Sequence, residues 1–438
     1  LSILLSLLVP AHAARSPDSA GIITPLGLSY RKSGPRTSHA ASREGGSSAL
    51  QPGHEIPNTR NFRNQISSIE VAELALSLIP YSGLRLNVDV DLGVTPAPST
   101  AEVMRLSILA ELHVEMNPDG NLEMVTSTCR PSAEMQSSEE MERSTPRFSL
   151  PSSGRFPDPT CRHCSPPSER PSARFAVPLP VTASCQVQYL PLAAPMFSEQ
   201  GVIISLQTTF QVAGMAIPLP VSPVPFSIPE LPSSSPFHFV LAFSEQFYTS
   251  LFFALEMAGA FNMTLPGRGR LPCPEITPLP RQMGSLFQED LEVTLQAVFR
   301  STPRVVLEED KAALKLFLTV HVGAGSSAFQ SFLSMNVDMS AGLLLSAGNR
   351  RMMISAAVIE DIELSLAASD VGPVPAALLE ELFLPTIREE VPAQINAVLS
   401  EGIFLPHVTN FIYIDANVTI HKDYVLVPCN LQLQVGSG

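Results

Sequence analysis

The chain has few charged residues, and basic residues are scarcer than acidic ones. Charged side chains make up 16% of its 438 residues, and 27 Lys and Arg stand against 41 Asp and Glu, for a formal net charge of -14. Nucleic acids and anionic membrane surfaces are bound through basic patches, so we expect no nucleic-acid partner. Residues 315–438 alone carry 12 acidic and 5 basic side chains, which disfavours polyanions there as well.

The chain also lacks the short motifs by which common enzyme classes are recognised. It contains no GxSxG elbow, no HExxH motif, no GxxxxGK[ST] loop, and no GxGxxG between a predicted strand and a predicted helix. His113 and His321 fall on the polar side of predicted strands, where a solvated histidine is far commoner than a catalytic one. We therefore expect a protein that is not an enzyme, with no catalytic residues and no cofactor.

Cysteine is scarce, with six residues at positions 129, 161, 164, 185, 273 and 429. Six thiols are compatible with disulfides in an oxidising compartment, and they permit 15 complete pairings among which the sequence does not choose. Cys161 and Cys164 form a lone CxxC. It has no second ligand pair at zinc-site spacing and does not open a helix after a strand. We interpret this pair as part of a loop and expect no metal site.

Long apolar runs are missing too. No stretch reaches 18 uninterrupted apolar residues, so we expect no transmembrane segment.

The run over residues 1–13, LSILLSLLVPAHA, has the length of a signal-peptide core and ends in the small-x-small pattern that signal peptidase recognises. We expect a partial signal peptide and a secreted, extracellular protein. A buried N-terminal strand is the alternative. In a secreted chain, the sequons at Asn262 and Asn417 predict glycosylation.

Two segments show no periodicity of regular structure. Residues 130–182 hold 10 Pro and 10 Ser in 53 positions, and residues 31–61 are similarly polar. Segments of this composition cannot bury enough apolar surface to fold. We therefore expect a poorly structured N-terminal segment over 14–65 and a Pro/Ser-rich disordered insert over 130–182. Mis-spliced sequence is an alternative interpretation of both.

Elsewhere apolar and polar residues alternate with the period of a β-strand. In LNVDVDL (86–92) every second residue is Leu or Val, with Asn or Asp between them, and 106–116 repeats the pattern. The same alternation predicts strands over 202–212, 314–322, 335–347, 354–366, 411–420 and 424–435. Long antiparallel strands, each with one apolar face, follow from this pattern.

Two predicted helices interrupt the strands. FSEQFYTSLFFALEMAGAF (243–261) carries apolar side chains well beyond the roughly 100° stripe of an ordinary surface helix. A second helix is predicted over about 376–400, where apolar residues oppose glutamates. The first helix follows AIPLPVSPVPFSIPELPSSSP, whose seven prolines in 21 residues predict an extended connector.

Four segments carry a likeness to known proteins: YLPLAAPMFSEQGVIISLQTTF, MAIPLPVSPVPFSIPEL, FHFVLAFSEQFYTSLFFALEMAGAFNMTL and INAVLSEGIFLPHVTNFIYIDANVTIHKDYVLV. They resemble the BPI/LBP/PLUNC family of secreted lipid-binding proteins, and most of all its long-PLUNC, or BPI-fold family B, branch. The resemblance covers residues 186–435 well and about 66–129 more weakly. It implies an α+β boomerang of two α/β barrels joined by a central antiparallel sheet, with an apolar pocket in each barrel.

The resemblance also implies a division of the chain. We expect a partial N-terminal barrel over 66–129, a central-sheet strand and Pro-rich connector over 183–236, and a C-terminal barrel over 237–438. Cys129 matches the first position of a disulfide that the family usually forms, but the Pro/Ser-rich insert replaces the helix that would hold its partner. The N-terminal barrel is therefore expected to be incomplete and interrupted by disordered segments.

The function implied by the resemblance is non-enzymatic binding of amphipathic lipid outside the cell, in innate defence. Phospholipid or fatty acid is the expected ligand. Lipopolysaccharide is less expected, because the acidic chain lacks the basic first domain of bactericidal members. The alternative is a structural or interaction protein of the extracellular space whose barrel core is closed and holds no lipid. Candidate pocket-lining residues lie on the two helices: Phe247, Leu251, Leu255, Leu382, Val391, Ile395 and Val398.

Overall fold

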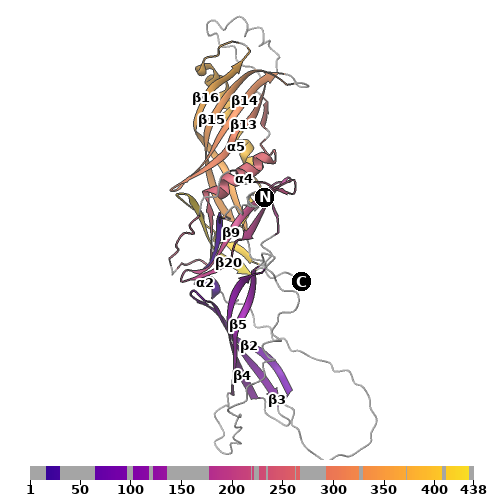
Figure 1. Cartoon of the computed structure of the whole chain (residues 1–438), viewed down its shortest axis with the longest axis vertical. Coiled ribbons are helices and arrows are strands. Elements are labelled where there is room, and N and C mark those ends of the chain that lie inside the picture. The colour runs from indigo at the N-terminus through magenta and orange to yellow at the C-terminus, as the bar shows by residue number, and fades with distance from the viewer. Residues whose placement is uncertain are drawn as a thin grey trace, which may run out of the picture.

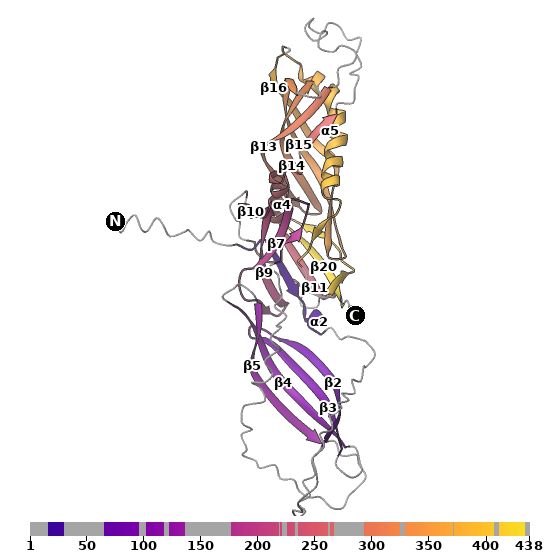
Figure 2. The same ribbon diagram turned by 90° about the vertical axis from the view of Figure 1, so that its right-hand side faces the viewer.

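The computed structural model describes residues 16–29, 65–95, 102–117, 122–135, 177–218, 220, 226–232, 235–261, 263–266, 293–324, 329–370, 372–406 and 411–433. These residues form three antiparallel sheets of four, ten and six strands. The sheets follow one another along the long axis of the molecule, with the ten-stranded sheet in the middle (Figures 1 and 2). The expected α+β class, with a central antiparallel sheet between two units, is confirmed.

The first unit is a four-stranded meander in the order β2-β3-β4-β5. Its strands are β2 (Gln65–Ile79), β3 (Gly83–Thr95), β4 (Glu102–Met116) and β5 (Leu122–Met135). The strands predicted over 86–92 and 106–116 lie within β3 and β4. Residues 130–135 belong to β5 rather than to the expected disordered insert, because their backbone pairs with residues 104–109 of β4.

The central sheet has the order β18-β20-β11-β1-β9-β7-β6, with the short strands β8, β10 and β19 added at its sides. The main strands are β18 (Phe411–Ile414), β20 (Tyr424–Leu433), β11 (Phe239–Ser244), β1 (Ser19–Ile23), β9 (Gly201–Val212), β7 (Cys185–Pro191) and β6 (Leu179–Pro180). The short strands are β8 (Met196–Ser198), β10 (Met215–Ala216) and β19 (Thr419–His421). The strand predicted over 411–420 divides at Asp415, where φ is 52°.

Strand β1 corrects the expectation for the N-terminal segment. It lies between β9 and β11, pairs antiparallel with both, and leads into the short helix α2 (Pro25–Leu28). A poorly structured segment over 14–65 is therefore wrong for residues 19–28. The sequence signal is weak because SAGII is short, and its partners lie far along the chain. The signal peptide expected over 1–13 lies outside the described residues, as do residues 14–15 and 30–64 of the segment and residues 136–176 of the insert. At the end of the insert, Leu179–Pro180 form β6, so the expected disorder is wrong there as well.

The six-stranded sheet has the order β12-β13-β14-β15-β16-β17. Its strands are β12 (Met263–Pro266), β13 (Val293–Glu308), β14 (Lys311–Ala324), β15 (Gln330–Gly348), β16 (Arg351–Ser369) and β17 (Ile403–Phe404). Register shifts interrupt the pairing of β13 with β14 and of β15 with β16. Such bulges increase strand twist, which is consistent with the curl of this sheet in Figure 1.

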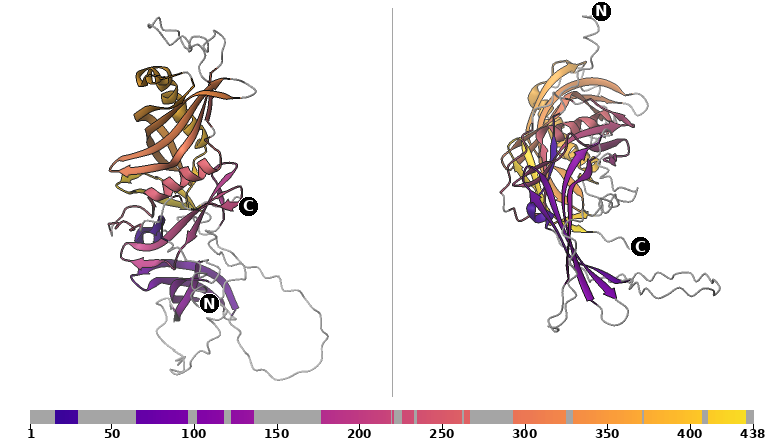
Figure 3. Two further views of the ribbon diagram at one scale, coloured as in Figure 1. Left: turned by 45° about the horizontal axis from the view of Figure 1, so that its top comes forward. Right: turned by 60° about the horizontal axis from the view of Figure 1, so that its bottom comes forward.

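Both predicted helices are confirmed. Helix α4 (Glu245–Met257) begins at the N-cap Ser244, whose hydroxyl accepts a hydrogen bond from the Phe247 amide at 3.3 Å. Helix α5 (Ala376–Val398) runs along one side of the six-stranded sheet (Figure 2). In Figures 1 and 3, α4 crosses the molecule where the six-stranded sheet meets the central sheet. The two helices and these two sheets enclose one large apolar core.

Candidate functional site

The three candidate lining residues on α4 are fully buried. Phe247, Leu251 and Leu255 are at most 1% exposed. Phe252, further round the helix, and Thr249, on its opposite side, are buried as well. Sheets on two sides of α4 account for this burial, because the helix contacts both β9 and β13. The breadth of the apolar surface on this helix therefore reflects its position between two sheets.

Helix α5 buries a narrower stripe than the sequence indicates. Val391 and Ile395 are buried, whereas Leu382 and Val398 are half-buried and pack at the edge of the core. Sequence reasoning missed three residues that are also buried on this face: Leu379, Phe383 and Ile387. Their spacing of four residues, continued by Val391 and Ile395, is the signal that would have identified them.

All seven candidate residues belong to, or pack against, the same core as the apolar face of the six-stranded sheet. Buried polar groups connect the helices to the sheets: the Thr249 hydroxyl accepts from the Val305 amide at 3.1 Å, and the Tyr248 hydroxyl lies 3.3 Å from the Met352 sulfur. Burial raises the pKa of Tyr248 well above its usual value, so its hydroxyl stays protonated. A lipid entering here would have to displace packed side chains.

The four-stranded sheet has a different apolar surface, which we call the open face. Residues paired across β2, β3 and β4 form rows, and in three of these rows each strand contributes an apolar residue. The rows are Val71, Val90 and Leu106; Leu74, Val88 and Ile108; and Leu76, Leu86 and Ala110. A bulge in β2 between Val71 and Glu73 keeps Val71 and Leu74 on the same side. The period-2 alternation of the sequence therefore produces one continuous apolar surface.

Among the residues that the structure describes, only the half of the open face nearest the central sheet is covered. There Leu84, Ala110 and Leu112 are buried against Val202, in a cluster that also includes residues of β1, α2 and β8. Toward the far end of β2, Ile69, Val71 and Leu74 are 60%, 61% and 59% exposed. Single exposed apolar residues are common, but three on one strand of an apolar sheet face mark a candidate binding surface.

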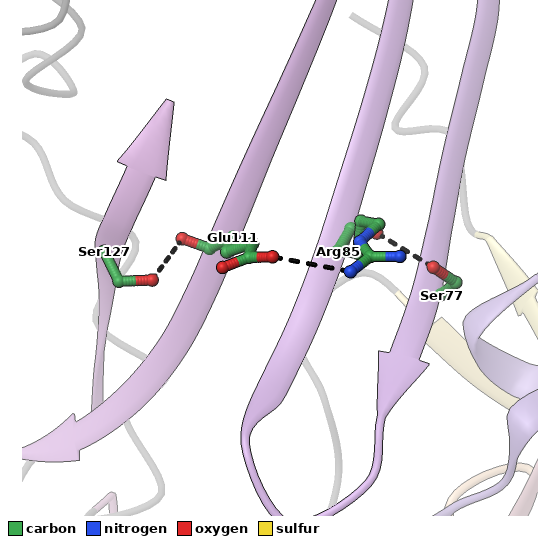
Figure 4. Close-up of polar contacts among 4 residues, drawn as sticks. All are labelled: Ser77, Arg85, Glu111 and Ser127. Atoms are coloured by element: carbon green, nitrogen blue, oxygen red, sulfur yellow. Dashed lines mark hydrogen bonds and ion pairs between the residues drawn. The ribbon is translucent and has the colours of Figure 1, made fainter. Parts of the chain in front are cut away.

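The opposite face of the same sheet is polar and joined by side-chain contacts (Figure 4). The Ser77 hydroxyl donates to the Arg85 carbonyl at 3.4 Å, the Arg85 guanidinium lies 3.4 Å from a Glu111 carboxylate oxygen, and the Ser127 hydroxyl donates to the Glu111 carbonyl at 3.0 Å. These contacts span all four strands. They indicate that this face meets water, which leaves the open face as the side that needs an apolar partner.

A second ion pair strengthens the polar face. Arg105 donates two hydrogen bonds to Asp91, at 2.8 and 2.9 Å, which is the bidentate geometry that favours a strong pair. These hydrogen bonds hold the pKa of Asp91 below its usual value. Acidic side chains on this sheet nevertheless outnumber basic ones, as in the chain as a whole.

The remaining predicted positions fall outside any common site. Cys185 and Cys429 are buried in the central sheet, where burial raises their pKa to about 11 and about 12, and Cys129 is half-buried on β5. The Nε2 atom of His113 lies 2.8 Å from a carboxylate oxygen of Glu115, and the Nδ1 atom of His321 lies 2.8 Å from the hydroxyl oxygen of Ser334. Asn417 is exposed. Asn262, Cys161, Cys164 and Cys273 lie outside the described residues.

No group of three metal-ligating side chains occurs in the part of the chain that the structure describes. Within the same residues, no helix is both long enough and apolar enough to cross a membrane. The features that distinguish this molecule are therefore its large enclosed core and the open face.

The architecture and the sequence define the class of protein. Residues 181–433 match the C-terminal domain model of the LBP/BPI/CETP family, and the chain belongs to this family. Over 444 residues it is 52% identical to Protein TENP of Gallus gallus, in an alignment that spans 98% of both chains. It is 26% identical to human BPI fold-containing family B member 2, over 58% of this chain and 57% of that protein.

Among solved structures, the crystal structure of lipopolysaccharide binding protein matches 96% of this chain and 100% of its own, with 15% identity and a TM-score of 0.44.

Proposed function

We propose that the protein is a secreted, non-enzymatic lipid-binding protein with a role in innate defence, and that the open face of the four-stranded sheet is a surface on which it holds acyl chains. The observation that carries this proposal is the exposure of Ile69, Val71 and Leu74 on an otherwise continuous apolar face. Membership of the LBP/BPI/CETP family supports it.

The energetics of the open face favour an acyl chain as its partner. Removing apolar surface from water contributes about 25 cal/mol per Å², or roughly 0.8 kcal/mol for each buried CH₂ group. A long acyl chain laid along β2 and β3 would therefore contribute far more than a single head-group contact. The net charge of -14 makes phospholipid or fatty acid a better ligand than a polyanionic lipopolysaccharide.

Replacing Val71 with aspartate tests this surface. We expect about tenfold weaker extraction of a fluorescent phospholipid from phosphatidylcholine vesicles, because a carboxylate opposed to an acyl chain loses hydration without gaining a partner. The folding cost is small, since Val71 is 61% exposed. Ser77→Asp is the matched control, because it places the same carboxylate on the polar face of the same strand and should leave extraction unchanged. Equal extraction by both variants would exclude the open face as the lipid surface.

The alternative function is a structural or interaction protein with a closed core. The burial of Phe247, Leu251, Leu255, Val391 and Ile395 supports it for the C-terminal unit. Measurements on the wild-type protein distinguish the two functions. Lipid carried through purification, or extracted from vesicles, supports the lipid-binding function. A protein that does neither would act through its surface.

Secretion is tested by glycosylation at Asn417. Its side chain is exposed beside β19, so the acceptor nitrogen is accessible, and we expect protein secreted from eukaryotic cells to carry a glycan there. Asn417→Gln should remove a mass that peptide N-glycosidase also removes from the wild type. If neither the enzyme nor the substitution changes the mass at this position, the site is not used, and the secretory proposal loses this support.

A further inference from the structure

A groove of about 650 Å³ lies where α4, β13 and the turn between β19 and β20 meet Phe226 and Ser227 of the Pro-rich connector. Its volume is within the usual range for small-molecule sites. Six of its lining residues supply two cations, two carboxylates and two aromatic rings: Arg304, Lys422, Glu245, Asp423, Phe226 and Tyr424. None of these residues belongs to the open face.

Backbone hydrogen bonds fix the walls of this groove. The Glu245 amide donates to the Asp423 carbonyl at 2.9 Å, and the Asp423 amide donates to the Leu307 carbonyl at 3.2 Å. The Glu245 carboxylate accepts from the Leu307 amide at 2.9 Å. These contacts connect α4, β13 and the β19–β20 turn, so their polar groups are held in place before any ligand arrives.

The two cations of the groove retain donors for a ligand. The Arg304 side chain is 66% exposed, and its nearest carboxylate oxygen, on Glu245, lies at 3.9 Å, too far for a hydrogen bond. The Lys422 ammonium has no hydrogen-bond acceptor among the described residues, and only its backbone amide bonds, to Glu309 at 3.3 Å. Guanidinium and ammonium groups placed in this way bind phosphate well.

The charge of the groove distinguishes between ligand classes. Arg304 and Lys422 are balanced by Glu245 and Asp423, so the formal local charge is zero. A simple anion would be attracted by the cations and repelled by the carboxylates. A ligand that carries both charges satisfies all four groups. The rings of Phe226 and Tyr424 add a surface suited to an organic cation.

We infer that this groove binds a small zwitterion in which a phosphate and an amine-type cation are joined by a short linker, as in phosphocholine and phosphoethanolamine. The phosphate contacts Arg304 and Lys422, and the cation lies near Asp423 and the aromatic rings. This ligand needs no acyl chain. The inference therefore goes beyond the lipid-binding function proposed above and is tested separately from it.

Calorimetric titration of the full chain with phosphocholine and with inorganic phosphate tests the site. We expect phosphocholine to bind more tightly than inorganic phosphate, and Arg304→Gln and Lys422→Gln each to weaken phosphocholine binding at least tenfold. Arg300→Gln is the matched control, because Arg300 lies on the same strand but pairs with Asp338 outside the groove. Unchanged melting temperatures would show that all three variants are folded.

Asp423→Asn tests whether the ligand is a zwitterion. Asp423 has φ of 72°, a conformation that asparagine also tolerates, so the turn should persist. Loss of this carboxylate should weaken phosphocholine binding and strengthen inorganic phosphate binding. The inference is overturned if the wild type binds neither compound at millimolar concentration, if it binds inorganic phosphate as tightly as phosphocholine, or if Arg300→Gln matches Arg304→Gln.

Phosphatidylcholine vesicles then identify the source of the zwitterion. Weaker vesicle binding by Arg304→Gln would assign the groove to a lipid head group. Unchanged vesicle binding, with loss of phosphocholine binding, would assign it to a soluble zwitterion. Both outcomes support the same binding chemistry.

Discussion

Replacing Gly201 with alanine is expected to lower the free energy of unfolding by at least about 3 kcal/mol. Gly201 opens β9 with φ of 134°, and a Cβ atom there would lie 2.0 Å from the carbonyl oxygen of Ile23. Moving the backbone of β1 or β9 apart here would be costly, because Ile23 pairs with Val202 at this end of β1. Strain of this kind in a packed sheet belongs to the class of large, diagnostic mutational effects.

Gly214 supplies a control just beyond the other end of β9. Its φ is 80°, but a Cβ atom added there would meet nothing within 4 Å. Gly214→Ala should therefore cost only about 1 kcal/mol, from the backbone conformation alone. Denaturant unfolding of both variants measures the difference. Equal losses would mean that backbone conformation, and not the contact with Ile23, sets the requirement for glycine at position 201.

The sequence predicts the elements whose signal is local. Alternation identified β3 and β4 of the first unit and β14, β15 and β16 of the last, and the breadth of its apolar surface distinguished α4 from an ordinary surface helix. Both signals depend on residues within a few positions of one another. Strand β1 escaped because its five residues acquire their structure by insertion between β9 and β11, which come much later in the chain.

In the candidate sites, too, the sequence predicts local features but not those set by distant parts of the chain. The pattern of β3 and β4 correctly places apolar residues on one face, but it does not reveal whether another element covers them. Exposure of Val71 and burial of Leu112, both apolar positions of one sheet, are set by the neighbouring central sheet. The groove that contains Arg304 and Lys422 could not be predicted from the sequence either, because its lining residues come from four separate parts of the chain.

The second large expected effect on stability concerns Asp18, which directly precedes β1. It is 4% exposed, and one of its carboxylate oxygens accepts hydrogen bonds from the Thr208 amide, the Thr208 hydroxyl and the Ser19 hydroxyl, at 2.9, 2.9 and 3.1 Å. Burial raises its pKa from 3.8 to about 6, although these hydrogen bonds oppose the shift. Burial raises the pKa of Tyr189 well above its usual value, and the charge of Asp18 raises it further.

A carboxyl group with a raised pKa in the folded state makes the protein more stable at low pH. The folded chain holds the proton of Asp18 more tightly than the unfolded chain, so this contribution is fully present below about pH 4 and is lost as the pH rises to about 6. The shift of about two pKa units corresponds to roughly 3 kcal/mol. Above pH 6 the folded protein therefore contains a buried charge that destabilises it.

Asp18→Asn should remove this penalty. The amide oxygen can still accept the hydrogen bonds from Thr208 and Ser19, and no charge is buried at any pH. We expect the variant to be up to about 3 kcal/mol more stable than the wild type at pH 7, and the two to converge toward pH 4. Urea unfolding measured across this pH range gives the difference directly. Asp310→Asn, the same substitution at an exposed turn, is the control. A variant less stable than the wild type at pH 7 would show that the charged carboxylate and its three hydrogen bonds outweigh the cost of burial.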